Sequence, residues 1–425
     1  MIPAINQLKK VVPPALKGPY RRFRSYVDRH YANRPYIKEI DLKRTLVGGE
    51  GTYDAVSWAE RTGDWQRVST PLENSIYVGF LAQYRELGEK IFDWKNFEHS
   101  DYFKNALRCV QFWGDYFGQR TPEGINAQAR AFITLYERSK NGDLNEVSFP
   151  SNKDHARPRT RPVVRETFTP NTYQIKDGHH RLAISWVLGN RKAKVTVVRP
   201  AEPSGLQSLV LKVSQTQGRK ELYQPIDSLE FDESWGLVRR CHDRFRMMLD
   251  FLTSRNYPLN KLSVVDLACS YGWFVNAFSK RSCDALGVEV DPTLLNIGRT
   301  AYGLQTEQLV QNDFTAFASN CDRTFDVVLL LSVLHYYPLK RAPGTPEEVL
   351  RKVDAITGSV LFFDTGQSHE EWWRKSLPEW NDEFIIKFIK ENTSFTHVSP
   401  LGRDSDNVGS YRNNYARTLF ACFRG

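Results

Sequence analysis

The fold is decided by one stretch in the second half of the chain, Val264-Val265-Asp266-Leu267-Ala268-Cys269-Ser270-Tyr271-Gly272-Trp273-Phe274. It is typical of a short buried strand, a tight turn of small residues and the start of a helix. A strand that ends in a carboxylate and turns directly into a helix presents free backbone N–H groups at the helix N-terminus. Doubly wound α/β folds hold a cofactor at such a turn. The stretch therefore predicts an α/β domain with a ligand site at the turn.

Three further elements follow this turn at regular spacing. Glu289 ends the next expected strand, where a carboxylate can accept hydrogen bonds from both hydroxyls of a ribose. Asn312 and Asp313 follow a third strand, and a fourth apolar strand over 325–332 ends at Ser332. In this order and spacing, the four elements resemble class I methyltransferases that use S-adenosylmethionine (SAM). The resemblance implies a Rossmann-like, seven-stranded sheet whose last strand runs antiparallel, with SAM as the methyl donor.

The resemblance also implies which residues contact SAM. Ala268 and Ser270 stand where the family more often has glycine, and only Gly272 is kept. Alanine and serine are small enough for close backbone approach, but they are less free than glycine in φ. The alternative is a strand–turn–helix from another Rossmann-like protein. The expected cofactor-binding residues are Asp266, Ala268, Ser270, Gly272, Glu289, Asn312, Asp313 and Ser332.

Length and composition indicate an intracellular protein of several domains. The chain has 425 residues, 41% of them hydrophobic, which is enough for two or three domains with cores of their own. Its six cysteines are scattered without a CxxC pair, so we expect reduced thiols in a cytoplasmic protein. No apolar run approaches the roughly 20 residues that span a bilayer. The N-terminus also lacks an apolar core of the signal-peptide type.

The formal net charge of +9 is concentrated at the N-terminus. Residues 1–45 hold eleven Lys and Arg against three acids, a net of +8. We therefore expect a basic arm over residues 1–50. It could pack one face on the protein, or it could bind the anionic inner face of a membrane peripherally. Binding of nucleic acid is a third and less favoured interpretation.

A second informative stretch is Tyr173-Gln174-Ile175-Lys176-Asp177-Gly178-His179-His180-Arg181-Leu182. It predicts a strand that ends at Asp177, a helix that begins near His180, and a further strand over 193–198. A helix N-terminus with two imidazoles and a guanidinium concentrates groups that bind anions. The acid beside them could hold a divalent metal or orient a nucleophilic hydroxyl. This motif resembles the ParB/sulfiredoxin superfamily, whose core motif is close to D-G-x-H-R or D-G-H-H-R on a strand-to-helix turn.

The resemblance implies a nucleotide-phosphate site, and in some members a small-molecule kinase. Here the α+β domain would cover 51–205, with helical additions and with ATP and Mg²⁺ as ligands. Asp177 would be the catalytic or metal-holding acid, and His179, His180 and Arg181 would bind phosphate. Glu73 is the position that we match to an upstream glutamate of the kinase members. The alternatives are a capping cluster without a ligand for the motif, and a surface or helix-cap acid for Glu73.

The segment between the two motifs is predicted to be a linker over 206–234, with a strand-like piece at 209–211. A helix is expected over 235–252, within a methyltransferase domain over 235–425. Tyr223 and Gln224 in the linker could close over the cofactor or make a simple linker contact.

His335 follows the fourth expected strand, where class I enzymes face the methyl donor. An imidazole near its pKa could deprotonate a hydroxyl there, or the residue could close the pocket structurally. Trp372 and Trp373 lie in a segment that often shapes acceptor specificity. They could stack on a sugar, or they could fill the edge of the core.

Three functions are consistent with these patterns. The first resembles the kinase–methyltransferases that cap bacterial O-antigens: one domain phosphorylates a surface glycan, and the other methylates that phosphate or a nearby hydroxyl. The second is a plain O-methyltransferase with a module in front that only binds a nucleotide or phosphate. The third is a ParB-like methyltransferase associated with nucleic acid. It is disfavoured because no basic recognition helix follows the Asp177–Arg181 motif, and no Asn/Asp-Pro-Pro-aromatic motif follows the fourth strand.

Overall fold

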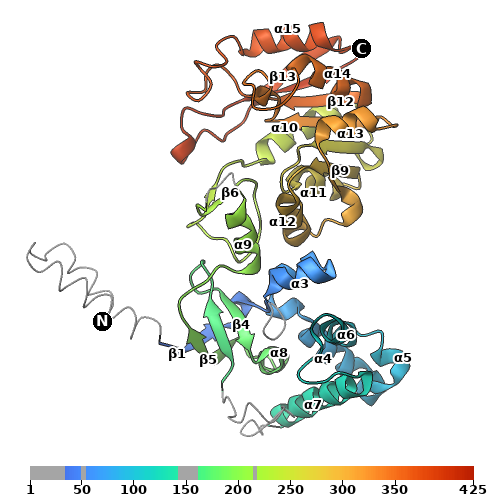
Figure 1. The fold of residues 1–425 in the computed structure, drawn as a ribbon, viewed down its shortest axis with the longest axis vertical. Coiled ribbons are helices and arrows are strands. Elements are labelled where there is room, and N and C mark those ends of the chain that lie inside the picture. The colour runs from blue at the N-terminus through green and yellow to red at the C-terminus, as the bar shows by residue number, and fades with distance from the viewer. Residues whose placement is uncertain (1–33, 49–53, 142–160, 214–217) are drawn as a thin grey trace, which may run out of the picture. The chain divides into compact units, whose positions relative to one another are not determined.

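A computed structural model describes residues 34–48, 54–141, 161–213 and 218–425. The chain divides into two compact units, Met1–Ser208 and Leu209–Gly425, and each is described by itself (Figure 1). Most of the basic arm, residues 1–33, lies outside the described residues. No helix among the described residues is both long enough and apolar enough to cross a membrane.

The first unit is built on a five-stranded mixed sheet with the order β1-β5-β3-β4-β2. The β1–β5 and β3–β4 pairs are antiparallel, while the β3–β5 and β2–β4 pairs are parallel. The arm predicted over residues 1–50 therefore contains two strands of this sheet, because residues 36–46 pair with strands that come much later in the chain. The strands are β1 (Tyr36–Asp41), β2 (Thr45–Leu46), β3 (Val163–Glu166), β4 (Tyr173–Asp177) and β5 (Lys192–Val198).

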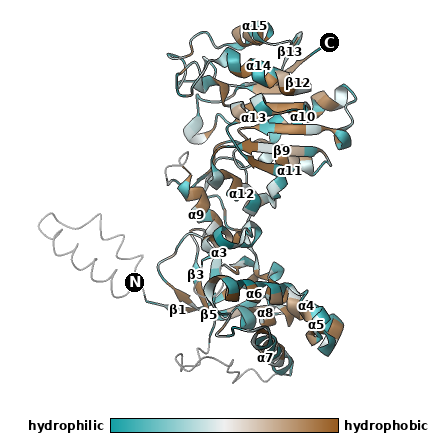
Figure 2. Cartoon of the chain, turned by 45° about the vertical axis from the view of Figure 1, so that its right-hand side comes forward, coloured by the Kyte–Doolittle hydropathy of each residue, from teal (hydrophilic) through white to brown (hydrophobic). Residues whose placement is uncertain are grey.

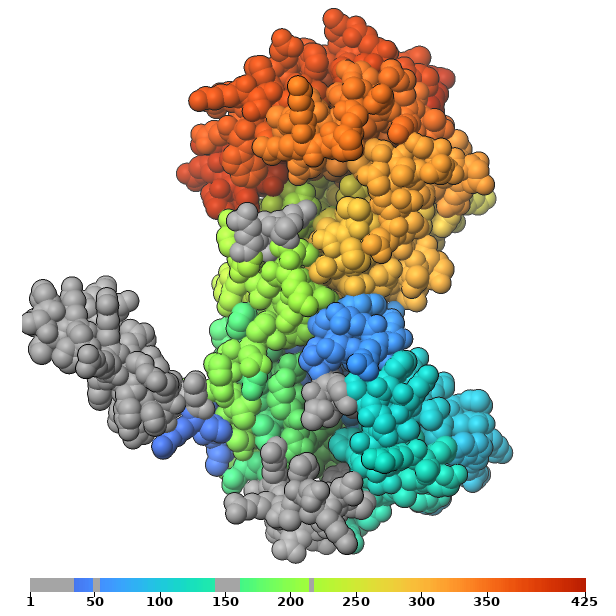
Figure 3. Space-filling model, in the orientation of Figure 1, coloured from blue at the N-terminus to red at the C-terminus, as the bar shows by residue number. Residues whose placement is uncertain are grey.

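Helices fill most of the chain between β2 and β3, as the sequence predicts. Their starts are capped by short polar side chains, with Ser75, Ser100 and Thr121 each accepting a bond from a backbone N–H of the first turn. Most of the aromatic residues of this region lie in the core, whereas Trp94 and Phe117 are exposed. In Figure 3 these helices form a blue-to-cyan surface of the unit. They are α3 (Ala55–Thr62), α4 (Ile76–Leu87), α5 (Trp94–Phe97), α6 (Asp101–Trp113) and α7 (Pro122–Lys140), followed after β4 by α8 (His179–Val187), with the 3-10 turns η3 (Leu42–Arg44), η4 (Trp65–Ser69), η5 (Leu72–Asn74) and η6 (Gly88–Phe92).

The second unit is built on a seven-stranded sheet with the order β10-β9-β8-β11-β12-β14-β13. The first five strands in this order are parallel, and β14 runs antiparallel to both of its neighbours. The predicted α/β fold with a seven-stranded sheet and an antiparallel last strand is confirmed. The strands are β8 (Ser263–Leu267), β9 (Asp284–Glu289), β10 (Leu309–Gln311), β11 (Phe325–Leu331), β12 (Thr357–Asp364), β13 (His397–Arg403) and β14 (Thr418–Phe423).

Helices cover both faces of this sheet, so that alternate residues of one strand enter two different cores. In β11, Val327 and Leu329 pack with α10, α11 and α12, whereas Val328 and Leu330 pack with α13, α14 and α15. The strands accordingly read as continuous apolar runs, brown in Figure 2. The helices are α10 (His242–Ser254), α11 (Trp273–Ser279), α12 (Pro292–Tyr302), α13 (Phe314–Asn320), α14 (Pro346–Ile356) and α15 (Asp382–Asn392), with the 3-10 turns η7 (Leu259–Lys261), η8 (Thr306–Gln308), η9 (Leu334–Tyr336) and η10 (Gly409–Tyr411).

Two predictions for the segment before this sheet are wrong. The strand-like piece at 209–211 lies within the helix α9 (Gly205–Lys212). Buried Leu206, Leu209, Val210 and Val213 recur at helical spacing, and this periodicity outweighs the strand preference of a short apolar run.

The helix expected over 235–252 begins seven residues later than its predicted start, at His242. The first residues of the predicted helix form a strand instead, because β7 (Gly236–Leu237) pairs with β6 (Glu221–Leu222). Cys241 then precedes the helix with a φ of 64°, which ends the extended segment.

Candidate SAM site

The sheet of the second unit places several carboxylates and small polar side chains at one edge. Its parallel strands all end at the same edge. From β8 the chain adds β9 and β10 on one side and then returns to add β11 on the other side of β8, so the strand order reverses between β8 and β11. Ligands of open α/β sheets bind outside the carboxyl ends of the strands at such a reversal. Asp266, Glu289 and Asp364 all lie in the last two positions of their strands. The topology therefore brings together the acids that the sequence separates.

The turn after β8 has an unusual backbone. Ala268, Ser270 and Gly272 have φ values of 61°, 54° and 78°, all in the left-handed region. This region costs a residue with a side chain roughly 1–2 kcal/mol, whereas glycine adopts it freely. The turn thus keeps the conformation that suits glycine even at the two positions where the chain has lost glycine. Strain of this kind persists where the surroundings over-determine the backbone, which is common at ligand sites.

Hydrogen bonds from outside the turn hold it in this conformation. Gln224 bridges the turn: its Nε2 donates to the carbonyl of Cys269 at 3.2 Å, and its Oε1 accepts from the N–H of Trp273 at 3.2 Å. The phenol of Tyr271 accepts from the N–H of Tyr223 at 3.3 Å. The segment 223–224 therefore contacts the turn itself, and its closure over the cofactor stays a prediction.

Helix α12 also approaches the turn closely. A Cβ added at Gly298 would lie 2.3 Å from the carbonyl oxygen of Tyr271. Only glycine allows this helix to lie directly against the turn, so Gly298 contributes to the site although no sequence motif pointed to it.

Asp266 is the most unusual acid of the site. Its side chain is 3% exposed, and its Oδ2 atom has no hydrogen-bond partner among the described residues. Burial raises the pKa of Asp266 to about 8; Arg244 lowers it, while Glu289 and Asp364 raise it further. The hydroxyl of Ser270, close by in the turn, is also buried without a partner. Buried polar atoms are rarely left unpaired, so these two atoms fit a ligand that donates hydrogen bonds, such as the ammonium group of SAM.

Glu289 is already engaged with the backbone. Its Oε1 accepts from the N–H groups of Val290 and Asp291 at 2.8 and 3.1 Å, and its Oε2 accepts from the N–H of Ser270 at 3.0 Å. A carboxylate has about four acceptor positions, so one remains at Oε2. Glu289 can therefore accept one ribose hydroxyl in this conformation, and accepting two would require it to release a backbone N–H.

The other predicted SAM contacts lie at the same edge. The N–H of Asn312 donates to the carbonyl of Glu289 at 3.1 Å. Asp313 caps α13 by accepting from the N–H groups of Thr315 and Ala316, both at 2.9 Å. Ser332 follows β11 with a φ of 61°, and its hydroxyl donates to Asp364 at 2.7 Å. The structure thus brings together all eight predicted cofactor residues around the ends of four neighbouring strands, β10, β9, β8 and β11, and the β8–α11 turn.

A buried charge cluster beside this site was not predicted. We call Arg239, Arg244, Asp364, Asp404 and Asp406 the arginine–aspartate cluster. Arg244 donates to Asp364 at 2.9 Å, and Arg239 contacts Asp364, Asp404 and Asp406 at 3.5, 3.3 and 3.1 Å. Burial acts to raise the pKa of Asp364, but Arg244, Arg239 and Arg417 outweigh it and bring the pKa to about 2. The one sequence signal was a carboxylate at the end of the fifth strand, a position equivalent to those of Asp266 and Glu289.

His335 is placed as a structural residue. It is 3% exposed, and its Nδ1 accepts from the N–H of Gly366 at 3.2 Å. Burial lowers the pKa of His335 to about 2, and Arg417 lowers it further. Its ring also stacks on Tyr336 and contacts Trp373, with centroids 4.6 and 5.1 Å away. An imidazole that accepts a backbone hydrogen bond at Nδ1 carries its proton on Nε2 and is a weak base, so this geometry favours pocket closure over general-base catalysis.

The Asp177–Arg181 motif of the first unit has the predicted local fold. Strand β4 ends at Asp177, Gly178 has a φ of 92°, and α8 begins at His179. The two imidazoles, however, are each 4% exposed. His179 Nε2 donates to the carbonyl of Val47 at 3.0 Å, and His180 Nε2 lies 3.1 Å from the hydroxyl of Tyr102.

Burial lowers the pKa of His180 to about 3, with smaller contributions from His179 and Arg181. Both imidazoles are buried and already hydrogen-bonded, so they offer little to a phosphate, and this placement favours the structural role for both histidines. Arg181 is more accessible and lies 3.5 Å from Asp177.

The predicted metal and kinase residues do not form a ligand set in the described part of the chain. No group of three or more His, Cys, Asp and Glu side chains there could hold a metal ion, and Asp177 faces a guanidinium instead. Glu73 is exposed in η5, which packs against α8. It lies near the motif, and its side chain has no partner among the residues that the structure describes.

The fold and this edge of the sheet define a class of enzyme, the class I SAM-dependent methyltransferases. Residues 264–354 match a family described as a methyltransferase domain, so the second unit contains such a domain. No curated protein matches the chain.

Several solved structures resemble part of the chain. A crystal structure of WbdD is 17% identical over 51% of this chain and 46% of its own, with a TM-score of 0.40; another WbdD structure describes that protein as a bifunctional kinase-methyltransferase. Magnesium protoporphyrin IX methyltransferase from Synechocystis PCC 6803 is 13% identical over 43% of this chain and 79% of its own, with a TM-score of 0.31. N-methyltransferase NodS from Bradyrhizobium japonicum WM9 is 15% identical over 52% of this chain and 97% of its own, with a TM-score of 0.33.

Proposed function

We propose that this protein transfers a methyl group from SAM to an oxygen atom that is already anionic when the acceptor binds. One observation carries the SAM part of the proposal: the buried, unpartnered Oδ2 of Asp266 at a strained turn, located where the winding of the sheet reverses. Bound SAM supplies an electrophilic methyl group to an attacking nucleophile. The residues of the turn and strand ends then have to hold the donor in place and exclude water.

Each of these residues has a specific part in that proposal. Asp266 and Ser270 accept from the ammonium group, and Glu289 accepts from one ribose hydroxyl through its remaining position at Oε2. Val290, directly after Glu289, is 63% exposed. An apolar side chain exposed beside a ribose-binding acid offers a surface to a purine ring.

The experiment that tests this assignment replaces Glu289. Glu289→Ala should weaken SAM binding by roughly 1.5–3 kcal/mol, the contribution of hydrogen bonds to a charged group. Glu307→Ala is the matched control, because Glu307 is an exposed acid of η8 in the same unit. Calorimetry that finds the same SAM affinity in Glu289→Ala and Glu307→Ala would contradict the assignment.

The choice of an anionic oxygen as acceptor is supported by the placement of His335, the residue predicted to act as the base. His335 is the histidine expected to face the methyl donor. Its Nδ1 already accepts a hydrogen bond from the N–H of Gly366 and its pKa is low, so it is unsuitable for proton removal. A carboxylate or a phosphate monoester needs no base at neutral pH, whereas a sugar hydroxyl does. His335→Gln should therefore reduce methylation of an anionic acceptor only by its effect on packing around Trp373 and Gly366.

A kinase activity of the first unit is the second candidate. It is supported by the strand–glycine–helix turn with the accessible Arg181, and it would install the phosphate that the second unit methylates, on a glycan acceptor. In that case Asp177→Ala stops methylation of the unmodified glycan, but not of the same glycan phosphorylated chemically.

If Asp177→Ala leaves methylation of both glycans intact, the first unit is a binding module and the protein is a plain O-methyltransferase. Attachment of the basic arm to a membrane remains a prediction about residues 1–33, and association with nucleic acid remains the least favoured alternative.

A further inference from the structure

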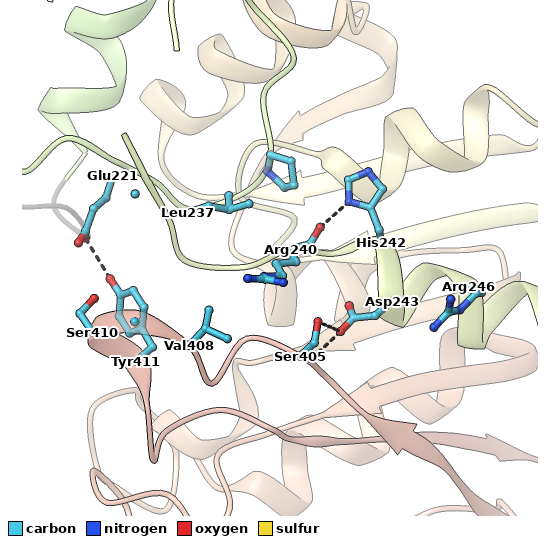
Figure 4. A pocket seen from close by; sticks show the side chains of 13 residues that line it. Glu221, Leu237, Arg240, His242, Asp243, Arg246, Ser405, Val408, Ser410 and Tyr411 are labelled. Carbon is cyan, nitrogen blue, oxygen red and sulfur yellow. Dashed lines mark hydrogen bonds between the residues drawn. The ribbon is translucent and has the colours of Figure 1, made fainter. Parts of the chain in front are cut away.

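The second unit contains a groove that no motif predicted. It has a volume of about 880 Å³ and is formed by three segments: the β6–β7 pair, the start of α10, and the loop between β13 and β14 (Figure 4). It is therefore large enough for a small-molecule ligand. Its lining residues include Leu237, Arg240, His242, Arg246, Val408 and Tyr411.

The groove is lined by two arginines and by two acids. Arg240 and Arg246 are exposed, and neither forms an ion pair with a carboxylate among the described residues. Both acids of the groove accept hydrogen bonds from other groove residues. Glu221 accepts from the hydroxyl of Tyr411 at 3.0 Å and pairs with Arg219 at 3.3 Å. Asp243 accepts from the N–H and the hydroxyl of Ser405, as the dashed lines of Figure 4 show.

The groove adjoins the turn of the SAM site. The ring of His242 contacts that of Trp273, the first residue of α11, with centroids 4.8 Å apart. Pro225 lines the groove and directly follows Gln224, whose side chain bridges the turn. One short segment is therefore a wall of the groove on one side and a support of the turn on the other.

The arginine–aspartate cluster gives a second connection between the groove and the strand ends. The N–H of Arg240 donates to Asp406 at 2.7 Å, and Asp406 pairs with the buried Arg239. Arg239 in turn contacts Asp364, which accepts from the hydroxyl of Ser332. The loop that forms the groove is thus anchored to the end of β12 and, through Asp364, to the end of β11.

Apolar side chains complete the groove. Leu237 and Val408 are exposed at 36% and 39%. Trp372 is 45% exposed beside the groove wall, and its ring meets that of Tyr411 edge-on at 6.0 Å. A wall with exposed apolar and aromatic surface next to two unpaired guanidiniums suits a molecule that has both a carbon-rich face and a negative group.

We propose that this groove binds the methyl acceptor, and that Arg240 and Arg246 hold an anionic group of it. The proposal rests on the function proposed above, since the groove adjoins the SAM turn. Guanidinium groups bind carboxylates and phosphates by the same paired hydrogen bonds. The shared chemistry is therefore a carboxylate or phosphate ester on a sugar-sized molecule, and the probes below separate the two.

The test measures binding of three probes to the full-length protein saturated with S-adenosylhomocysteine. The probes are glucose 6-phosphate, glucuronate and methyl glucoside, which carry a phosphate, a carboxylate and no charge. We expect at least one anionic probe to bind and methyl glucoside to bind much more weakly. The double variant Arg240→Gln/Arg246→Gln should weaken the anionic probe roughly tenfold to a hundredfold. Preference for one anionic probe then identifies the source of the charge.

Arg351→Gln is the matched control, because Arg351 is an exposed arginine of α14 that does not line the groove. It should leave the binding of all probes unchanged. Affinity for S-adenosylhomocysteine should be the same in the wild type and in both arginine variants, which also shows that the double variant is folded. Binding of neither anionic probe to the wild type, or equal binding to the double variant, would overturn the groove assignment. A wild type that fails to bind S-adenosylhomocysteine would instead overturn the proposed function.

Discussion

Both units contain a strand-to-helix turn with an aspartate and a glycine, but the side chains around the two turns are placed differently. In each, an aspartate lies at or next to the end of a strand, and a glycine in the left-handed region directly precedes a helix: Asp177 and Gly178 before α8, and Asp266 and Gly272 before α11. Because both N-cap residues are glycines, no N-cap side chain accepts a hydrogen bond from the first N–H groups of either helix. Both sequences therefore suggest helix N-termini available to a ligand.

The difference lies in what happens to the side chains around each turn. In the first unit, both histidines are buried and bonded to Val47 and Tyr102, and Asp177 faces Arg181. In the second unit, Asp266 and Ser270 each keep a buried polar atom that has no hydrogen-bond partner in the described part of the chain. A turn whose polar groups are satisfied internally serves the fold, whereas one that leaves buried groups unsatisfied is prepared for a ligand.

The largest expected effect compares a buried and an accessible aspartate. Asp364→Ala leaves Arg239 and Arg244 buried without their shared partner, and should lower the free energy of unfolding of the second unit by about 3–5 kcal/mol. Asp177→Ala removes an accessible ion pair and should cost about 0–1 kcal/mol. Urea denaturation of the full chain measures both. Equal losses in the two variants would contradict the contrast between the units.

The next effect concerns the unpartnered oxygen of the SAM site. Asp266→Asn should weaken SAM binding roughly tenfold to a hundredfold, because it removes the charge that pairs with the ammonium group. The wild type should also release protons on binding SAM near neutral pH, since the cation lowers the raised pKa of Asp266. Calorimetry in buffers of different ionisation enthalpy detects this release. Asp266→Asn should show none of it.

The same variant tests the pKa of Asp266 without a ligand. The pKa of about 8 lies above the value in an unfolded chain, so the stability that the protonated carboxyl contributes is fully present below about pH 4. That stability is lost as the pH rises through 8. The ligand-free wild type should therefore lose stability relative to Asp266→Asn over this range, and parallel pH profiles would contradict the raised pKa.

A smaller effect on stability, with the opposite dependence on pH, is expected in the first unit. His180→Phe removes the hydrogen bond to Tyr102 and should cost about 1 kcal/mol of stability near neutral pH. The pKa of His180 is lowered to about 3, so the contribution of its neutral form is present above about pH 6.5 and is lost as the pH falls toward 3. The variant should thus approach the stability of the wild type in acid.

The two residues of the motif should also differ in nucleotide binding. Arg181→Ala should abolish any binding of ATP or ADP to the first unit, whereas His180→Phe should leave it unchanged. Loss of nucleotide affinity in His180→Phe without a loss of stability would restore His180 as a phosphate ligand.

The smallest effect concerns the support of the SAM turn. Gln224→Ala removes two hydrogen bonds to the turn, and should weaken SAM binding by about 0.5–1.5 kcal/mol. Gln305→Ala is a suitable control, since Gln305 lies in a turn that precedes β10 and contacts only neighbouring residues. A Gln224→Ala variant with full SAM affinity would show that the strained turn is stable without this bridge.

Much of the second unit could be predicted because its information is local. Apolar runs of strand length, each ending in a carboxylate or a small polar residue, indicate both the parallel sheet and the edge where a ligand binds. The predictions failed where two local signals competed. Residues 209–211 look like a strand, but the spacing of Leu206, Leu209, Val210 and Val213 makes a helix. Helix α10 begins at His242 and not at the predicted residue 235, because β7 pairs with β6 and this contact forms only in the folded protein.

By itself, the sequence determined the α/β fold of the second unit, and it located the turn after β8 and the acids at the strand ends that we assign to SAM. The tertiary structure alone decided which polar groups remain available. It buries His179 and His180 among partners from distant segments and joins Arg239 and Arg244 to three aspartates. Among the described residues, it leaves Oδ2 of Asp266 without a hydrogen bond and the two groove arginines without a carboxylate partner. The physical reason is that strand and helix patterns depend on neighbours in sequence, whereas burial, pairing and pKa depend on neighbours in space.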